Sequence, residues 1–177
     1  GHVWADPALL ETDLAGRFAR GLHFPTEAHM DPRAALGALR GALIARAVPF
    51  RGGPPRGRIV DCRGMGAAPH LPDLRAVRGE MIEVSVPDLR LTRTIRLLHP
   101  RFPCYIVPRE GGRYMIGATM VESARTGGVT ARAVMELLSA AYTVHPGFAE
   151  AEVVATGAGL RPAFADNIPA IRRDGAR

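Results

Sequence analysis

The residue whose setting most suggests chemistry is Arg161, which lies in the run Gly159–Pro162. Glycine frees the backbone and proline fixes it, so an arginine framed by both occupies an unusual backbone position. Its planar guanidinium can grip a carboxylate through two parallel hydrogen bonds. The alternative is a structural ion pair at the surface or between domains. The sequence therefore makes Arg161 a candidate anion-binding residue and leaves both interpretations open.

Tyr105 is the second candidate, and it lies in an apolar run between Cys104 and Ile106. Its phenolic hydroxyl could donate a hydrogen bond to a ligand. A tyrosine in an apolar strand is more often part of the core, with its hydroxyl bonded to one protein partner. The same argument assigns Tyr114, on the facing strand, a structural role.

Gly64 and Gly66 follow the apolar segment Ile59–Cys62. A glycine pair after a strand lets the backbone approach a phosphate or a ring closely. The dinucleotide-binding fingerprint needs a third glycine three residues later, where this chain has Pro69. A tight turn is therefore the simpler interpretation of the pair.

Other chemistries find little support. The two cysteines, Cys62 and Cys104, form no Cys-x-x-Cys motif, and no histidine pair has metal-ligand spacing. We therefore expect no metal site, and we expect both thiols to be buried and inert. The carboxylates Glu80, Glu83 and Asp88 flank predicted strand ends and are expected to be ordinary solvated groups.

The elements that position these residues begin with a short helical stretch at Leu9–Phe18. Asp31 is a good N-cap and Pro32 suits a first helical turn, and apolar residues at three- and four-residue spacing then predict an amphipathic helix to about Ala47. Gly52–Pro55 predicts a loop, and Ile59–Cys62 a short strand.

The second half of the chain is mostly β-rich. Strands are predicted at Met81–Val86, Thr94–Leu98, Phe102–Pro108, Arg113–Thr119 and Ala151–Thr156, with a hairpin turn at Glu110–Gly112. Thr130 predicts the start of a helix that Pro146 stops, with Val134, Leu137, Leu138, Ala141 and Tyr142 on one face. These elements predict an α+β fold, a mixed or antiparallel sheet flanked by helices.

Composition favours a small-molecule protein over a nucleic-acid-binding one. The formal charge is +6, but all basic residues are arginine, scattered along a chain rich in alanine, glycine and proline. Neither a block of like charges nor interleaved aromatics is present, so no nucleic-acid partner is expected. No apolar run approaches the ~20 residues of a membrane span, so we expect no membrane and a cytoplasmic location.

Four short sequence blocks occur in an order that is typical of a known family. They are Val77–Met81, Pro103–Arg109, Ile116–Met120 and Gly159–Pro162, and Asp166–Pro169 follows them. Together they resemble the second half of the FAD-dependent amino-acid oxidases, most closely the glycine oxidase of thiamine biosynthesis. The similarity runs from about Asp31 to the C-terminus.

The resemblance implies roles for five residues. Tyr105 and Arg161 would hold the substrate carboxylate as the catalytic pair, and Met120 would line the small substrate pocket. Gly64 and Met65, with Arg161, would contact FAD. The implied reaction is oxidative deamination of glycine or another small amino acid to an imine or 2-oxo acid, with release of peroxide. Family members are often homo-oligomers.

The resemblance also implies a domain division. Residues 1–58 would be the N-terminal helical part of the substrate half, 59–70 a partial flavin-domain strand and turn, 71–156 the substrate-binding sheet, and 157–177 a return segment toward the flavin domain. A strand–Gly-x-Gly-x-x-Gly–helix unit and the family's His-x-Arg-Asn-Gly-like segment do not occur in the sequence. We therefore expect weak or no FAD binding, and no turnover, from this chain alone. The rival function is a non-catalytic domain that binds a carboxylate or an amino acid.

Overall fold

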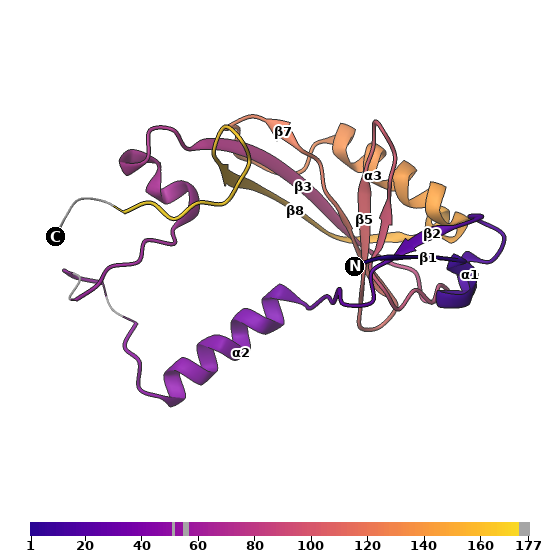
Figure 1. The fold of residues 1–177 in the computed structure, drawn as a ribbon, viewed down its shortest axis with the longest axis horizontal. Coiled ribbons are helices and arrows are strands. Elements are labelled where there is room, and N and C mark those ends of the chain that lie inside the picture. The colour runs from indigo at the N-terminus through magenta and orange to yellow at the C-terminus, as the bar shows by residue number, and fades with distance from the viewer. Residues whose placement is uncertain (51, 55–56, 174–177) are drawn as a thin grey trace.

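The computed structural model describes residues 1–50, 52–54 and 57–173 of the chain. Its strands are β1 (Val3–Ala5), β2 (Gly21–His23), β3 (Arg75–Ser85), β4 (Ile95–Leu97), β5 (Cys104–Arg109), β6 (Arg113–Gly117), β7 (Val121–Glu122) and β8 (Glu152–Ala163). Its α-helices are α1 (Pro7–Leu10), α2 (Pro32–Ala45) and α3 (Ala131–Val144), and 3₁₀ turns cover Thr12–Leu14, Gly64–His70 and Pro146–Glu150 (Figure 1).

The long strand β3 organises the main sheet. Strand β8 pairs along one edge of β3, while β6 and β7 pair with successive stretches of the other edge. Strands β5 and β4 continue the sheet beyond β6, and every strand pair is antiparallel (Figure 1). The hairpin predicted at Glu110–Gly112 is confirmed, and Gly111 and Gly112 both adopt positive φ there. The predicted α+β fold class is confirmed.

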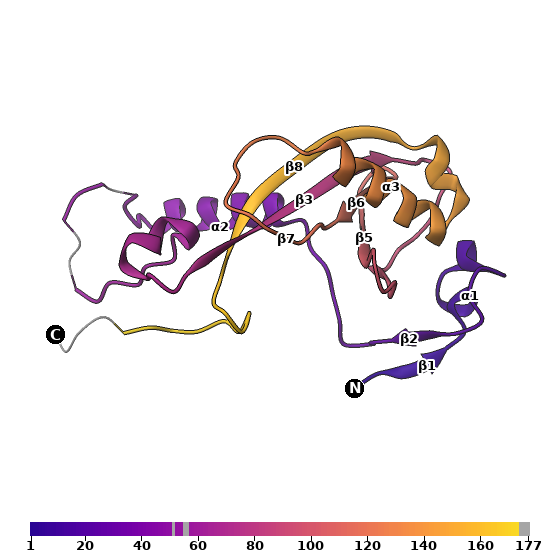
Figure 2. The same cartoon turned by 90° about the horizontal axis from the view of Figure 1, so that it is seen from above.

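The two faces of the sheet differ because side chains alternate along each strand. In β3, Ile82 and Val84 are fully buried, whereas Gly79, Met81 and Glu83 point to the other face and are half-buried. Helix α3 packs on the first face (Figure 2). We call the face beneath α3 the covered face and the opposite one the open face.

Helix α3 begins where the sequence predicts. The Thr130 side chain accepts a hydrogen bond from the Ala133 backbone N–H at 3.2 Å, and Leu137 and Ala141 are buried against the sheet. Tyr142, predicted to share that face, is instead 53% exposed. Five residues of helix turn it roughly 140° away from Leu137, so both cannot face the sheet.

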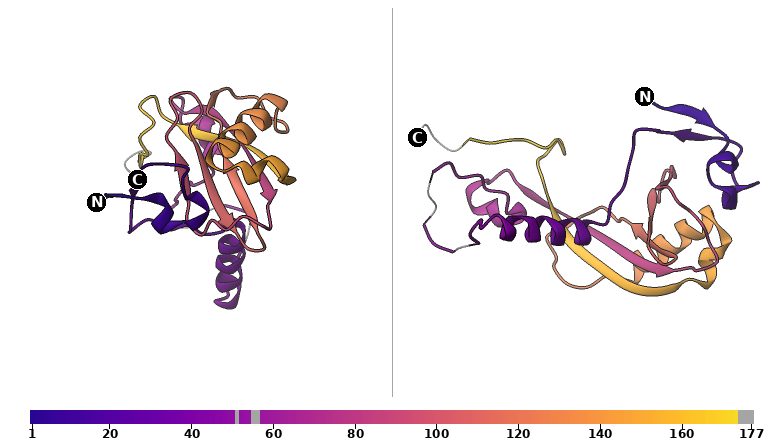
Figure 3. Two further views of the ribbon diagram at one scale, coloured as in Figure 1. Left: turned by 90° about the vertical axis from the view of Figure 1, so that its right-hand side faces the viewer. Right: turned by 90° about the horizontal axis from the view of Figure 1, so that it is seen from below.

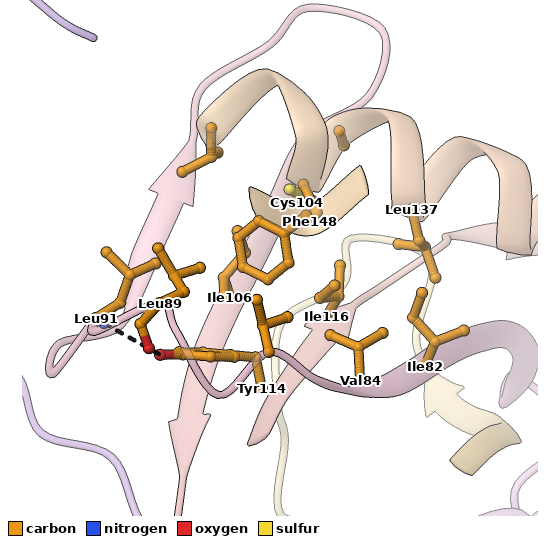
Figure 4. Packing of buried hydrophobic residues seen from close by; sticks show 14 of the residues in the cluster. Ile82, Val84, Leu89, Leu91, Cys104, Ile106, Tyr114, Ile116, Leu137 and Phe148 are labelled. Atoms are coloured by element: carbon orange, nitrogen blue, oxygen red, sulfur yellow. Dashed lines mark hydrogen bonds between the residues drawn. The ribbon is translucent and has the colours of Figure 1, made fainter. Parts of the chain in front are cut away.

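The core lies between α3 and the covered face (Figure 4). The Tyr114 hydroxyl donates to the Leu89 carbonyl and accepts the Leu91 N–H at 3.2 Å, and its ring meets Phe148 edge to face at 5.6 Å. Tyr114 therefore has the structural role predicted for it. Cys104 is also buried here, and burial raises the pKa of its thiol to about 11. The expectation for Cys62 is wrong, since that residue is exposed.

The N-terminal segment is tied to one end of the sheet. The single helical stretch predicted at Leu9–Phe18 is instead broken after Leu10, because Glu11 has an extended backbone. Its buried carboxylate accepts hydrogen bonds from the Thr92 N–H and hydroxyl, both at 2.9 Å. This long-range contact outweighs the local helical preference.

Helix α2 forms as predicted but buries none of its residues. The Asp31 carboxylate caps it, accepting from the Arg33 N–H at 2.8 Å. The apolar residues Leu36 and Leu39 are 70% and 59% exposed, and the helix stands apart from the sheet (Figures 1 and 3). Pro55, in the loop predicted to follow, lies outside the described residues.

The segment Ile59–Cys62 is not a strand, contrary to prediction. Ile59 and Val60 are 65% and 76% exposed. Strand geometry is stabilised by hydrogen bonds to a neighbouring strand, and this segment pairs with none among the residues described.

The last strand is twice as long as the predicted Ala151–Thr156 segment. Strand β8 continues without interruption to Ala163, across the domain boundary predicted after residue 156. Arg161 therefore lies within a paired strand, beyond the end of the predicted strand segment. Across the described part of the chain, no helix is both long and apolar enough to cross a membrane.

Candidate functional site

Tyr105 and Arg161 lie on the same face of the sheet. Tyr105 pairs with Gly117, which pairs in turn with Met81 of β3. Arg161 pairs with Val77, four residues before Met81 on the same strand. Directly opposed residues and every second residue point to the same side of a sheet. Both side chains therefore project onto the open face, from strands that are not adjacent.

Each of these two side chains lies over a glycine. A Cβ built on Gly79 would be 2.5 Å from Nη2 and 2.6 Å from Cζ of Arg161. A Cβ built on Gly117 would be 3.0 Å from both Cζ and the hydroxyl oxygen of Tyr105. The guanidinium and the phenol therefore rest directly on the sheet backbone, in space that a side chain at either glycine would take.

The two glycines are diagonal neighbours, because Gly117 pairs with Met81 and Gly79 lies two residues before it. In a regular antiparallel sheet such positions are about 7–8 Å apart. A carboxylate that accepts a hydrogen bond of about 2.8 Å on each side spans roughly that gap. The spacing of the two glycines is thus compatible with the predicted binding of one carboxylate by Arg161 and Tyr105, and this binding stays a prediction.

Arg161 is oriented by the protein without being neutralised. Its Nη1 donates to the Thr119 carbonyl at 3.3 Å. Within the described ranges, Arg161 takes part in none of the ion pairs. Its positive charge is therefore available to a ligand, which favours anion binding over a structural ion pair within this chain.

Thr119, which supplies that carbonyl, is fixed by Glu80. The Thr119 N–H donates to the Glu80 carbonyl at 3.1 Å, and the Glu80 N–H donates to the Thr119 hydroxyl at 2.9 Å. The Thr119 hydroxyl in turn donates to the Glu80 carboxylate at 3.3 Å. The position of Arg161 on the open face is therefore linked to a carboxylate on the covered face.

The expectation of a solvated Glu80 is wrong, since this residue is only 1% exposed. It forms an ion pair with Arg78 at 3.1 Å and accepts the Thr130 N–H at 2.8 Å. Burial by itself raises the pKa of Glu80. The hydrogen bonds from Thr130 and Arg78, with the charge of Arg78, outweigh it and hold the pKa below its usual value. A signal was present in the sequence, because Arg78 and Glu80 share the parity of the buried Ile82.

Arg78 extends this buried network to the loop before α3. Its guanidinium donates to the backbone carbonyls of Arg125, Gly127 and Gly128, while its Nε is buried without a partner. With Glu80 bound to Thr130, the pair fixes both the loop and the start of the helix.

Gly64 and Met65 begin the 3₁₀ turn that packs near the end of β8. Gly64 has a φ of +61°, which glycine adopts without strain, and its Cβ position is 3.8 Å from the ring of Pro162. The turn therefore lies next to the residue that follows Arg161. Its predicted contact with FAD stays a prediction.

Met120 follows Thr119, whose carbonyl accepts from Arg161, but it lines a different hollow from Tyr105. Met120 is 76% exposed and lines a hollow of about 370 Å³, shared with Phe102 and Leu137. Tyr105 instead lines a cavity of about 1120 Å³ between the N-terminal segment and strands β4 and β5. The predicted role of Met120 in the substrate pocket stays a prediction.

Comparison with known proteins gives a consistent picture. The FAD dependent oxidoreductase family matches residues 2–177. The "Putative thiamine biosynthesis oxidoreductase ThiO" of Rhizobium etli is 50% identical over 99% of this chain and 56% of its own length. The glycine oxidase of Geobacillus kaustophilus is 38% identical over 52% of this chain and 24% of its own. The chain thus spans about half or less of the length of these curated relatives.

Solved structures agree with the sequence comparisons. The crystal structure of glycine oxidase from Geobacillus kaustophilus superposes with a TM-score of 0.51 at 33% identity, covering 61% of this chain and 30% of its own. Iminodiacetate oxidase from Chelativorans has a TM-score of 0.62 over 82% of this chain and 47% of its own. At 22% identity this second similarity shows the fold alone.

Proposed function

The chain belongs to the FAD dependent oxidoreductase family, and we propose that it supplies the substrate-binding part of an oxidase for glycine or another small amino acid. The proposal rests on one observation. Arg161 and Tyr105 lie on one open face, each over a glycine, and the two glycines are diagonal neighbours in the sheet. The similarity to a protein named glycine oxidase supports a small amino acid as the substrate class.

Arg161 and Tyr105, which we together call the clamp, would orient the substrate for the reaction. A carboxylate held by Arg161 on one side and Tyr105 on the other fixes the amino acid at two points, so its Cα–H is presented in a narrow range of directions. Orientation of this kind lowers the barrier without any charge transfer from the protein. The imine that forms is then hydrolysed by water to the 2-oxo acid and ammonia.

The open face fits the family's cofactor. Arg161 lies over Gly79 and Met81 lies over Gly157, whereas no atom lies within 4 Å of the Cβ position of Gly159, so the surface at Gly159 would be open to a cofactor beside a bound carboxylate. When FAD is bound, it supplies the hydride acceptor, and oxygen reoxidises it with release of peroxide. Gly64 and Met65, beside the end of β8, and Arg161 are the residues proposed to contact it.

A role in thiamine biosynthesis is the finer part of the proposal. It is supported by the printed name of the Rhizobium etli relative, which shares 50% identity over nearly all of this chain. Peroxide formation from glycine and thiamine auxotrophy on deletion of the gene are separate measurements, so either part can fail alone.

The test uses the full-length gene product. Flavin content is read from visible absorbance before and after adding FAD and desalting, and peroxide is measured with glycine and other small amino acids. We expect Arg161→Ala to weaken substrate binding by about 2–5 kcal/mol. The flavin content of the same variant tests the contact with FAD that is predicted for Arg161. Arg173→Ala, at an exposed arginine twelve residues further along the chain, is the matched control.

Two outcomes would contradict the proposal. Protein that retains flavin yet yields no peroxide from any small amino acid would remove the proposed substrate class. Protein that binds glycine or acetate through Arg161 without retaining flavin would instead support the rival function, a carboxylate-binding domain without catalysis.

A further inference from the structure

We propose that Gly79 and Gly117 are positioning residues: because neither has a side chain, Arg161 and Tyr105 can lie against the sheet at the depth that a small carboxylate ligand requires. This inference rests on the proposed function of the clamp. In this view, Gly79 and Gly117 determine where the Arg161 guanidinium and the Tyr105 hydroxyl lie, although neither glycine needs to touch the ligand.

The contact distances make the effect of a methyl group at each position different. Ordinary van der Waals contact of a Cβ begins at 3.4 Å, whereas the Gly79 position is 2.5 Å from the Arg161 guanidinium. A methyl group there would displace the guanidinium by about 0.9 Å, which is the difference between the 3.4 Å of ordinary contact and the observed 2.5 Å. The Gly117 position is 3.0 Å from the Tyr105 ring, so the ring would move by about 0.4 Å.

The methyl group at Gly79 would act on the clamp rather than on the fold. The atoms it meets belong to the far end of a flexible, exposed side chain, which can move without disturbing the core. Gly79 does not have a positive φ, so alanine is compatible with its backbone. Misplacement of a binding group by about 1 Å can cost roughly 100-fold in function.

The strand beside Gly79 provides a matched control. Gly159 is the direct cross-strand partner of Gly79, so it lies on the same face. No atom lies within 4 Å of its Cβ position, and its φ is not positive. Gly159→Ala therefore adds the same methyl group to the same surface without touching either clamp residue.

The experiment measures acetate binding by calorimetry, together with the thermal unfolding temperature, on the full-length gene product. Acetate carries the carboxylate without the amine, so its binding does not depend on turnover. We expect Gly79→Ala to weaken acetate binding about 10- to 100-fold and Gly117→Ala severalfold, with Gly159→Ala within twofold of wild type. The unfolding temperatures of all three variants should match the wild type.

Arg161→Ala separates this inference from the proposed function. If Arg161→Ala binds acetate as well as wild type does, the proposal that Arg161 and Tyr105 bind a carboxylate is wrong. If Arg161→Ala loses binding but Gly79→Ala keeps it within twofold, the clamp stands and the role of the glycines is overturned. Should Gly79→Ala not fold, Gly117→Ala against Gly159→Ala decides the question, and equal affinities would overturn the inference.

Discussion

The two faces of one sheet use the same strands for different purposes. On the covered face, Ile82, Ile106 and Ile116 are fully buried beneath α3. On the open face, the residues that alternate with them include Gly79, Gly117 and Gly159, and the long side chains of Arg161 and Tyr105 lie across this backbone. Large apolar residues fill the covered face beneath α3, whereas Gly79 and Gly117 on the open face leave the space in which Arg161 and Tyr105 lie.

The comparison shows how stability and binding can be separated by one residue along a strand. Because side chains alternate, each strand can hold a core residue and a site residue next to each other. The hydrogen bonds of Glu80 and Thr119 cross this division, since they link the buried network to the carbonyl that orients Arg161. Pairs of substitutions, one on each face, test whether stability depends mainly on the covered face and ligand binding mainly on the open face.

The largest effect is expected from breaking the buried ion pair. Glu80→Gln leaves the buried Arg78 guanidinium without its counter-charge, which should lower the free energy of unfolding by about 3–5 kcal/mol. Glu83→Gln, on the open face of the same strand, removes only a half-exposed pair with Arg113 and should cost about 1 kcal/mol or less. Urea denaturation of both variants measures the difference, and equal losses would contradict a division between the faces.

A core truncation should come next. Ile116→Ala removes a fully buried side chain from beneath α3, with an expected loss of about 2–5 kcal/mol in the free energy of unfolding. Its neighbour Met115 points to the open face and is half-buried, so Met115→Ala should cost about 1 kcal/mol. Both are read from the same denaturation curves. A larger loss at Met115 would show that the open face is packed in the native protein.

Removing one hydroxyl from each face gives a smaller, mirrored pair of effects. Tyr105→Phe should weaken acetate binding by about 1 kcal/mol, roughly fivefold, and leave stability unchanged. Tyr114→Phe removes a hydroxyl bonded to Leu89 and Leu91, so it should lower stability by about 1 kcal/mol and leave acetate binding unchanged. Calorimetry and denaturation are measured on both variants. Lower stability in Tyr105→Phe, or weaker acetate binding in Tyr114→Phe, would contradict these two assignments.

The smallest effect is a pH dependence from Glu80, because burial and hydrogen bonding act on its pKa in opposite directions. The folded pKa lies below the ordinary 4.5, so this stabilisation is fully present above pH 4.5 and is lost as the pH falls through the folded value. The unfolding temperature of wild type should therefore fall more steeply below about pH 4.5 than that of Glu80→Gln. Parallel curves would mean that Glu80 does not carry this acid sensitivity.

Local patterns predicted several elements correctly. The caps at Asp31 and Thr130, the spacing of apolar residues after them and the glycine-containing turn at Glu110–Gly112 each matched an observed boundary. The failures came where a distant contact decided the outcome. Glu11 is drawn to Thr92 and breaks a predicted helix, and Ile59–Cys62 has a strand-like composition but pairs with no strand among the described residues.

The sequence alone determined which residue types could grip a carboxylate and the order of the blocks that carry them, because both are properties of the chain read in one direction. Only the tertiary structure decided that Arg161 and Tyr105, far apart in sequence, share one face. It also decided that each lies over a glycine, and that Glu80 is buried rather than solvated. The register of β3 against β6 and β8 fixes these relations, and register depends on contacts between distant segments.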